Sequence, residues 1–485
     1  MLRKLRVIAA MMVFCALTLF FLNIIDSFGI LARVQLIPSL LAANILSLLM
    51  LGVVTLLMGR IYCSVLCPLG ILQDIVDRIA QKRSKKKRRF TYVSAKNRWR
   101  YTFFAGTVLA TMGGVALLLE LLDPYSIFGR IITHLLGPVW LSINNLLAPF
   151  LEQHGIYLIM KQMIYSQEIE ILLIPFTSLL LIVFLSGKYG RLYCNVICPA
   201  GTLLGILSRF SLFGIVVDQE KCNHCGLCAS MCKASCLDSK NQKVDYSRCV
   251  DCFNCLMVCP QKALSFRNRF SEKTMDHAER SDTKLLSRRQ FFQAGVLSVL
   301  GAAGIAARTA AAPSFREAFD ENLPVLPPGA EGMQHFATHC TSCHLCISKC
   351  PNQVIQPGKF ADGMKAVLQP VMDFKKGYCD YSCHLCGEIC PAQAINKQLL
   401  SKKRRTRIGH VVYTKSSCVV ETDGVSCGNC AIHCPVQAIT MVDTEGKKFP
   451  VVDDRKCIGC GSCEYHCPAN PRAMHVVGFL NQGQS

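Results

Sequence analysis

Four apolar stretches, separated by polar segments, dominate the first half of the chain. They cover residues 7–25, 36–58, 101–122 and 169–186. Each approaches the length of roughly 20 residues that a helix needs to cross the hydrocarbon core of a membrane. The pattern therefore predicts four membrane-spanning helices. The first is expected to be retained rather than cleaved as a signal peptide, because no small-residue cleavage site follows it.

A fifth region, residues 125–167, is only half apolar. Pro138, Asn144, Asn145 and Pro149 interrupt it, and it contains few cations. Proline and asparagine are poorly suited to the interior of a long helix. We therefore expect short helices that lie on the periplasmic surface of the membrane rather than another span.

Cations lie next to the apolar stretches. Three precede the first stretch and a dense run follows the second, namely Arg3, Lys4, Arg6, Lys82, Arg83, Lys85, Lys86, Lys87, Arg88 and Arg89. Cytoplasmic loops of membrane proteins are rich in Lys and Arg, so this pattern places the N-terminus and that loop in the cytoplasm. The net charge of +21 is thereby explained. Nucleic-acid binding is disfavoured, since no nucleic-acid-binding fold is recognisable.

One motif occurs twice, at the end of the second stretch and again at the end of the fourth. Its pattern is G-R-[IL]-Y-C-x3-C-P-x-G, at residues 59–70 and 190–201. This duplication predicts a pseudo-symmetric pair of helical hairpins. A spacing of four places both thiols of a motif on one helix face. Metal binding, a redox-active pair, contact with quinone and a structural role remain open for the four cysteines, which are Cys63, Cys67, Cys194 and Cys198.

A polar, cysteine-rich segment begins at Asp218. Its two blocks have the spacing C-x2-C-x2-C-x3-C, which is typical of two-cluster ferredoxins whose fourth cysteine binds the cluster of the other block. Lys233 replaces the usual proline, and Cys236 is a competing ligand or a spare thiol. The spacing predicts one [4Fe–4S] cluster on Cys222, Cys225, Cys228 and Cys259, and another on Cys249, Cys252, Cys255 and Cys232.

The two cysteine-rich halves are separated by Ser287-Arg288-Arg289-Gln290-Phe291-Phe292 and a Gly/Ala-rich apolar run that ends at Ala312. This segment resembles a twin-arginine export signal, which implies the twin-arginine export machinery as a partner. Four spans would return the chain to the cytoplasm, where the signal is read. The run is long enough to form a fifth, signal-anchor span. Cleavage after Ala312 remains open.

Four further cysteine blocks follow, and each ends in Cys-Pro. The first gap is one residue longer in the second block and much longer in the third, so we expect longer loops there. The first block contains C-x-x-C-H, but its two further cysteines favour a cluster over a haem. The blocks predict four more clusters, six in all, on Cys340, Cys343, Cys346, Cys350; Cys379, Cys383, Cys386, Cys390; Cys418, Cys427, Cys430, Cys434; and Cys457, Cys460, Cys463, Cys467.

These observations predict a membrane α-helical protein with four spans, a fifth signal-anchor span and two ferredoxin-like α+β [4Fe–4S] domains. The expected regions are a transmembrane domain, a cytoplasmic two-cluster domain, a linker with the signal helix, and a periplasmic four-cluster domain. Their bounds are 1–210, 211–266, 267–312 and 313–485.

Six clusters conduct single electrons, but the chain has no nucleotide fingerprint and no flavin site that would supply them. A quinol is the natural two-electron donor in a membrane. Its oxidation releases two protons, so a base near the membrane is expected. Glu120, Asp123 and His134 are the candidates, because ionisable residues near spans are often functional.

Residues 1–266, with the spans, the repeated motif and the two-cluster segment, resemble the membrane polyferredoxins of the NapH type. Residues 287–476, with the twin-arginine segment and four blocks, resemble the periplasmic ferredoxins of the NapG type. The chain thus resembles a NapH–NapG fusion in reversed order. Family membership implies a quinol dehydrogenase component of the bacterial inner membrane that passes electrons from menaquinol or ubiquinol to a periplasmic reductase or c-type cytochrome.

The resemblance also assigns a role in quinol oxidation or electron entry to Cys63, Cys67, Cys194 and Cys198. Resemblance to four-cluster polyferredoxins favours exchange of cysteines between the first and fourth blocks and between the second and third, with neighbouring pairs as the alternative. A second functional class is a membrane iron–sulfur protein for maturation or regulation of a respiratory oxidase or reductase. The copper-insertion family is not expected to carry an exported four-cluster tail, and the nitrous oxide regulators carry a flavin domain, so electron transfer is favoured.

Overall fold

The computed structural model describes residues 1–83, 90–113, 115–155, 161, 168–270, 323–359, 367–444 and 446–484. Its internal contacts divide the chain into two compact units. Unit 1 contains the described residues of 1–20, 25–131 and 174–270, and unit 2 those of 21–24, 132–173 and 323–484. The twin-arginine segment, Lys85–Arg89 and Ala312 lie outside the described residues.

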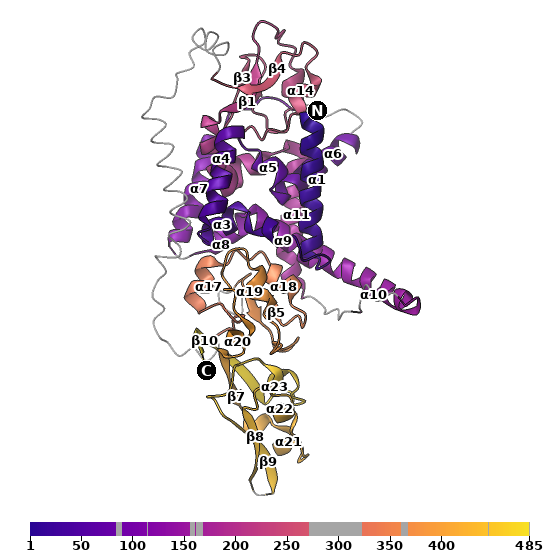
Figure 1. Cartoon of the computed structure of the whole chain (residues 1–485), viewed down its shortest axis with the longest axis vertical. Helices are drawn as coiled ribbons and strands as arrows, with labels where there is room; N and C mark the ends of the chain where they lie inside the picture. Colours follow the sequence, from indigo (N-terminus) through magenta and orange to yellow (C-terminus); the bar gives the residue numbers. More distant parts are fainter. Residues whose placement is uncertain are drawn as a thin grey trace. The chain divides into compact units, whose positions relative to one another are not determined.

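Helices form the first part of unit 1 (Figure 1). In chain order they are α1 (Leu2–Phe21), α2 (Gly29–Arg33), α3 (Leu36–Leu41), α4 (Ile45–Met58), α5 (Tyr62–Val65), α6 (Pro68–Arg83), α7 (Asn97–Met112), α8 (Leu117–Leu122), α9 (Pro124–Ile131), α11 (Ile169–Tyr189), the π-helix η2 (Tyr193–Ile197), α12 (Pro199–Leu207) and the 3-10 turn η3 (Ser208–Phe210). The first residues of α11 and the last residue of α1 belong to unit 2.

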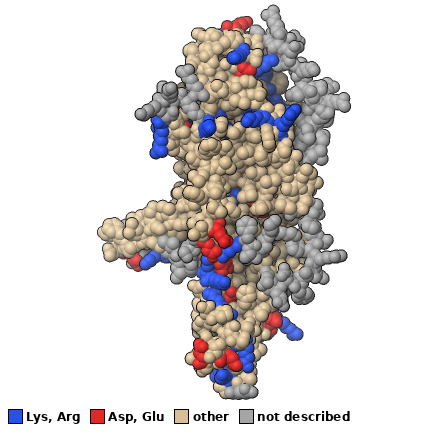
Figure 2. Space-filling model, turned by 180° about the vertical axis from the view of Figure 1, so that it is seen from behind, with Lys and Arg blue, Asp and Glu red and all other residues tan. Residues whose placement is uncertain are grey.

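Within the described residues, three helical stretches are long and apolar enough to cross a membrane. They are Leu2–Phe21, Pro124–Gln153 and Ile169–Tyr189. The first and third correspond to the expected first and fourth spans. In the view of Figure 2, Lys and Arg gather in a row at one end of the helices of unit 1, and the sides of these helices carry almost no charge.

The expected spans 36–58 and 101–122 are each divided in two. The first breaks between α3 and α4, where Ala43 has a φ of 49° and the side chain of Asn44 accepts a hydrogen bond from the backbone of Ser47. This is an N-cap, so a new helix starts there despite the continuous hydropathy. The second breaks between α7 and α8, where Gly113 caps the end of α7. Within the described residues, the structure therefore contains three candidate membrane helices, and the expected fifth, signal-anchor span lies outside those residues.

The expectation of short helices is wrong for residues 125–153 of the region 125–167. Pro124–Gln153 is one helical stretch, formed by α9, the π-helix η1 (Ile132–Leu136) and α10 (Gly137–Gln153). Pro138 falls in the first turn of α10, where its missing N–H has no helical acceptor. Pro149 is accommodated inside the helix. Neither proline ends the helical stretch: Pro138 follows the π-helix η1, and Pro149 lies within α10.

The last part of unit 1 is a small α+β fold around two cysteine blocks. Its elements are β1 (Phe213–Val217), α13 (Leu227–Ser230), β2 (Leu237–Asp238), β3 (Lys243–Val244), α14 (Asn254–Val258) and β4 (Leu264–Asn268). β1 pairs antiparallel with β4, and β2 with β3. Ile215, Leu237, Phe253 and Leu264 pack into a core that touches most of the cysteines.

Unit 2 contains η1, α10 and the cysteine-rich C-terminal region. The elements of that region are α17 (Met333–His339), α18 (Leu345–Lys349), β5 (Ile355–Pro357), β6 (Pro370–Met372), α19 (Leu385–Ile389), α20 (Leu400–Lys403), β7 (Thr406–Tyr413), the 3-10 turn η6 (Lys415–Ser417), α21 (Val419–Thr422), α22 (Asn429–Ile432), β8 (Ile439–Thr444), β9 (Lys447–Val452), α23 (Ser462–Tyr465) and β10 (Met474–Gln484). The antiparallel pairs are β5 with β6, β7 with β10, and β8 with β9. These pairs frame a core of small apolar residues and cysteines.

Candidate iron–sulfur sites and the twin cysteine motif

The six cysteine blocks share one local geometry. In four of them, the residue before the short helix has a left-handed backbone, at Gly226, Phe253, His344 and Gly461. In five blocks the third residue after the fourth cysteine is also left-handed, at Ser235, Lys262, Gln353, Gln393 and Gln437. The first turn wraps three cysteines around one point, and the second turns the chain away after the fourth. A left-handed backbone is unfavourable without a compensating constraint, which marks these loops as built for a ligand.

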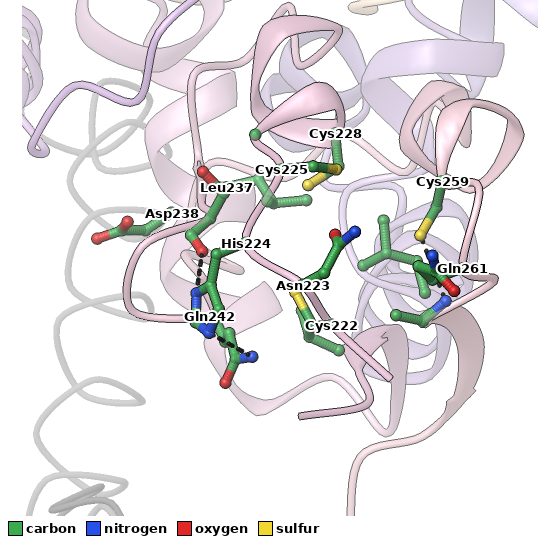
Figure 3. A pocket seen from close by; sticks show the side chains of 15 residues that line it. Cys222, Asn223, His224, Cys225, Cys228, Leu237, Asp238, Gln242, Cys259 and Gln261 are labelled. Carbon is green, nitrogen blue, oxygen red and sulfur yellow. Dashed lines mark hydrogen bonds between the residues drawn. The ribbon is translucent and has the colours of Figure 1, made fainter. Parts of the chain in front are cut away.

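The structure brings the cysteines of unit 1 together in the exchanged pattern. Figure 3 shows Cys222, Cys225 and Cys228 around one cavity with Cys259 from the other block. The backbone N–H of Ala263 donates to Cys259 Sγ at 3.3 Å. A second cavity is lined by Cys249, Cys252 and Cys255 with Cys232 and Cys236.

Cys236 is buried in the second cavity, with its Sγ 3.5 Å from Cys232 Sγ. It stands four residues after the last cysteine of its block, where Ala263 and Ala438 stand in two other blocks. Those alanines donate their backbone N–H to the preceding cysteine sulfur. By this correspondence Cys236 occupies the position of those alanines, although it lines the same cavity as Cys232.

Unit 2 exchanges cysteines between neighbouring blocks. Cys350 of the first block lines a cavity with Cys379, Cys383 and Cys386 of the second. Cys467 of the fourth block lines another with Cys418, Cys427 and Cys430 of the third. The reciprocal members agree, because, besides burial, Cys390 helps to raise the pKa of Cys346, and Cys434 that of Cys463. The preferred pairing of first with fourth and second with third is therefore wrong, and the neighbouring alternative holds.

The cysteine sets fit clusters rather than single ions. Among the described residues, no three His, Cys, Asp or Glu side chains converge closely enough to hold one metal ion. Four cysteines around a cavity suit a cubane, which keeps its ligands apart at separate iron corners. Clusters bound there would supply one-electron transfer. The protein's own contribution is the left-handed loops, the apolar cores and the N–H···S hydrogen bonds.

The two copies of the repeated motif, called here the twin motif (residues 59–70 and 190–201), interlock in unit 1. Arg60 Nη2 donates to the carbonyl oxygen of Cys194 at 3.0 Å, and Arg191 Nη1 donates to that of Cys63 at 2.8 Å. Each guanidinium also lies 3.7 Å from the sulfur of the cysteine in its own copy. The duplication in sequence thus becomes a reciprocal contact.

Glycine is required where the copies meet. A Cβ at Gly70 would lie 2.2 Å from the carbonyl oxygen of Cys63, and one at Gly201 would lie 2.2 Å from that of Cys194. The cysteines also differ from the simple expectation of one helix face. Cys63 lies in α5 and Cys194 in η2, whereas Cys67 and Cys198 directly precede Pro68 and Pro199, which start α6 and α12.

The four thiols of the twin motif are buried. Cys194 Sγ donates to Gln73 Oε1 at 3.2 Å, and Cys198 Sγ accepts from the backbone N–H of Gly201 at 3.2 Å. Burial raises the pKa of Cys67 and Cys198 well above the usual thiol value. They are therefore neutral thiols at pH 7 in this arrangement. No single-ion site forms there among the described residues.

A buried ionic cluster joins the twin motif to the iron–sulfur part of unit 1. Asp74 in α6 pairs with Arg6 at 2.9 Å, with Arg191 at 2.7 Å and with Lys233. Lys233 follows Cys232, and its carbonyl oxygen accepts from the backbone N–H of Arg191. Burial alone would raise the pKa of Asp74, but Arg191, Lys233 and Arg6 hold it well below its usual range. The lysine that replaces the expected proline is thus a buried ion-pair partner.

The first copy of the twin motif makes the matching contacts. Arg60 Nη1 donates to the carbonyl oxygen of Ser247 at 3.0 Å and to Asn195 Oδ1 at 2.9 Å. Asn195 Nδ2 in turn donates to the carbonyl oxygen of Ala234. Sequence reasoning missed this docking function of Arg60, Asp74 and Arg191. The sequence feature that could have indicated this docking function is the duplicated Gly-Arg pair, because cysteine chemistry alone does not require an arginine there.

The three candidate bases differ in environment. Asp123 Oδ2 accepts from the backbone N–H of Ser126 at 2.9 Å and from its hydroxyl at 2.6 Å, so Asp123 caps α9. The backbone carbonyl of Glu120 accepts from Arg130, and the carboxyl is buried. His134 lies in η1 of unit 2, where its Nε2 is 2.6 Å from Nδ1 of His344. The histidine of the C-x-x-C-H motif therefore contacts another histidine.

Comparison with protein families agrees with these sites. A 4Fe-4S binding domain model matches residues 40–87 and 171–215, which include both copies of the twin motif. Two 4Fe-4S dicluster domain models match residues 245–354 and 425–470. The last match contains the third and fourth blocks of unit 2 except Cys418, in agreement with their exchange of cysteines. No solved structure matches the chain.

Three curated relatives illustrate the similarity. The ferredoxin-type protein NapF of Escherichia coli (strain K12) is 31% identical over 134 residues, which are 27% of this chain and 73% of NapF. The methylamine utilization ferredoxin-type protein MauN of Paracoccus denitrificans is 25% identical over 39% of the chain and 54% of its own length. MauM of Methylobacillus flagellatus is 27% identical over 38% and 79%. The chain spans about half the length of the curated relatives it matches first.

Proposed function

Because the chain belongs to the family of ferredoxin-type iron–sulfur proteins that includes NapF, we propose that it is a membrane quinol dehydrogenase component. The chain carries multiple 4Fe-4S clusters and transports electrons. The proposal adds the donor, which is menaquinol or ubiquinol, and the acceptor, which is a periplasmic reductase or a c-type cytochrome. It also sets the number of clusters at six.

One observation supports this proposal more than any other. Two separate groups of cysteine-lined cavities belong to a chain that also contains three helices able to cross a membrane. A one-electron conductor attached to a membrane needs a lipid-soluble donor, and quinol is the common one. The charge row in Figure 2 supports a cytoplasmic location for that end of unit 1. The NapH–NapG arrangement, with export of the C-terminal region by the twin-arginine machinery, belongs to the same proposal.

The twin motif has a defined place in this scheme. Its thiols lie in the segment that Arg60 and Arg191 join to the iron–sulfur part of unit 1. We assign to Cys63, Cys67, Cys194 and Cys198 a redox role beside the sites of Cys232 and Cys249. Dithiol oxidation to a disulfide releases two electrons and two protons, which two oxidised clusters and the surrounding water would accept.

The decisive experiment uses membranes that contain the full chain. Ubiquinol-1 or menadiol is added anaerobically, and the loss of the oxidised-cluster absorbance and the appearance of reduced-cluster electron paramagnetic resonance (EPR) signals are recorded. We expect at least one of the two quinols to reduce the clusters. If dithionite reduces the clusters while neither quinol does, the quinol dehydrogenase function is refuted, and a role in maturation or regulation of a respiratory enzyme takes its place.

A further inference from the structure

Unit 2 contains a large cavity that the iron–sulfur sites do not use. Its volume is about 710 Å³, which falls within the range of roughly 300–1,000 Å³ for small-molecule sites. All lining residues belong to unit 2. They include aromatic side chains such as Trp140 and Tyr378, and polar groups at a few points, which is the usual composition of a site for a flat ring.

One wall of the cavity comes from α10. Gly137, Pro138, Trp140 and Leu141 line it. The outer surface of the same helix is apolar, with Val139, Ile143 and Leu146 exposed by 54%, 45% and 76%. Since α10 belongs to a helix able to cross a membrane, a lipid-soluble ligand can approach the cavity along it.

The cavity walls are held together by buried polar contacts. Lys349 Nζ of α18 donates to Asn23 Oδ1 at 2.9 Å, and both residues are near or in the lining. His134 of η1 lies on the lining and contacts His344, with 3% and 2% of these residues exposed. The first cysteine block is thus joined to the residues after α1 through Lys349 and to η1 through His344.

The histidine contact has a definite polarity. His344 Nε2 is 2.8 Å from the carbonyl oxygen of Leu368, which can only accept, so Nε2 carries the proton. In the neutral pair, His344 Nδ1 then accepts from the Nε2–H of His134. A proton gained by His134 is stabilised by the same bond, which becomes charge-assisted. His344 is a positioning residue for His134.

A cysteine of a candidate cluster site lies in the same wall. Cys350 lines the cavity, and it also groups with Cys379, Cys383 and Cys386 around a cluster site. His344 immediately follows Cys343 of the neighbouring cluster site. A ring in the cavity would therefore sit against a cysteine of one cluster site and near a loop of another.

We propose that this cavity is a quinol-oxidation site, in which His134 accepts a proton from a quinol hydroxyl and electrons leave beside Cys350. This inference rests on the proposed function and assigns quinol binding to unit 2 rather than to the twin motif. Oxidation of one quinol to quinone releases two electrons and two protons. Clusters held by the cysteine sites of unit 2 would supply two one-electron acceptors, while His134 would take the first proton and water the second.

The first test maps the site directly in membranes that contain the full chain. An azido derivative of ubiquinone-1 is photolysed, and the labelled peptides are identified. We expect labels on residues 134–141 or 347–353. Gly137→Leu should abolish these labels, because the leucine side chain would occupy space in the cavity. The protein should tolerate the substitution, since a Cβ at Gly137 meets nothing closer than 3.6 Å. Leu146→Ala is the matched control, since Leu146 lies on α10 but is 76% exposed and does not line the cavity.

The second test measures the function of His134. His134→Gln should slow quinol-driven cluster reduction by about 100-fold, the usual effect of losing a positioned base. Iron content and reduction by dithionite should stay at the wild-type level. Unchanged quinol-driven rates in both His134→Gln and Gly137→Leu, or labels confined to the twin motif, would overturn the site while leaving the proposed function intact. A wild-type protein that no quinol reduces would instead overturn the proposed function.

Discussion

Arg191 of one motif copy donates a hydrogen bond to the carbonyl oxygen of Cys63 in the other copy, at 2.8 Å. Arg60 makes the reciprocal bond to Cys194. Both arginines also reach the segments that carry the cluster cysteines, through Lys233 and Ser247. The twin motif is therefore an anchor for the iron–sulfur part of unit 1 as well as a set of four thiols.

Replacing Arg191 by lysine should weaken this anchor. Lysine keeps the charge near Asp74 but has no planar fork to reach the carbonyl of Cys63 at the same time. The lost buried hydrogen bond predicts destabilisation by about 1–3 kcal/mol, measured by thermal or denaturant unfolding of the purified chain. Lys221→Gln serves as the control, because its ion pair with Asp218 is exposed and should contribute less than about 1 kcal/mol. If Arg191→Lys and Lys221→Gln lowered the free energy of unfolding equally, the anchoring function of Arg191 would be contradicted.

The contact glycines should not tolerate a methyl group. Gly70→Ala and Gly201→Ala each place a Cβ 2.2 Å from a carbonyl oxygen, so the two motif copies must separate. We expect a loss of at least about 1–3 kcal/mol, together with lower yield of the folded, cluster-loaded chain. Gly106→Ala in α7 has no neighbour within 4 Å and should be neutral or slightly stabilising. Normal stability of Gly70→Ala would show that the copies do not meet as described.

Asp74 should make the stability of unit 1 depend on pH in the acid range. Its pKa in the folded protein is lowered by Arg191, Lys233 and Arg6, despite burial. A lowered folded pKa adds stability above the unfolded value of about 3.9, and this stability is lost as pH falls towards the folded pKa. Asp74→Asn should remove this acid dependence and also cost about 3–5 kcal/mol at neutral pH, because buried cations lose their counter-ion. Unfolding measured between pH 3 and pH 7 gives both quantities, and an unchanged acid profile would refute the assignment.

Cys232 and Cys236 should respond differently to serine. Cys232→Ser should remove or convert one cluster, because Cys232 holds the ligand position of its block. Cys236→Ser should keep the iron content of the wild type and change only the EPR spectrum or potential of that cluster, since its sulfur lies 3.5 Å behind the ligand. Iron analysis and EPR of the reduced chain decide between them. Loss of a cluster in Cys236→Ser alone would reverse the roles.

The twin-motif thiols can be separated from the anchor by conservative substitution. Cys63→Ser and Cys194→Ser keep the backbone carbonyls that accept from Arg191 and Arg60, so the fold and the cluster content should be retained. If the thiols have a redox role, quinol-driven reduction of the clusters in unit 1 should slow by at least about 10-fold. Stopped-flow absorbance and EPR measure this rate. Unchanged rates would make the four thiols structural.

Cysteine spacing was enough to predict the iron–sulfur character of this protein. Cysteine spacing sets the length of the loop that wraps a cluster, so Cys222, Cys225 and Cys228 could be assigned without coordinates. The exchange of Cys259 and Cys232 also follows from spacing, because the chain turns away after the fourth cysteine. The duplicated Gly-Arg-x-Tyr-Cys pattern predicted two similar structures. Hydropathy was less informative about where helices begin and end, since it does not detect an N-cap such as Asn44.

The tertiary structure decided which distant residues meet. Block spacing is the same whether Cys350 joins the second block or the fourth, and only the tertiary structure shows that it joins the second. Lys233 replaces the proline that the cysteine spacing predicts, and only the structure shows its ion pair with Asp74. His134 and His344 are 210 positions apart and belong to different patterns, one apolar and one cysteine-rich. Such contacts arise from side-chain packing between segments, which no local spacing encodes.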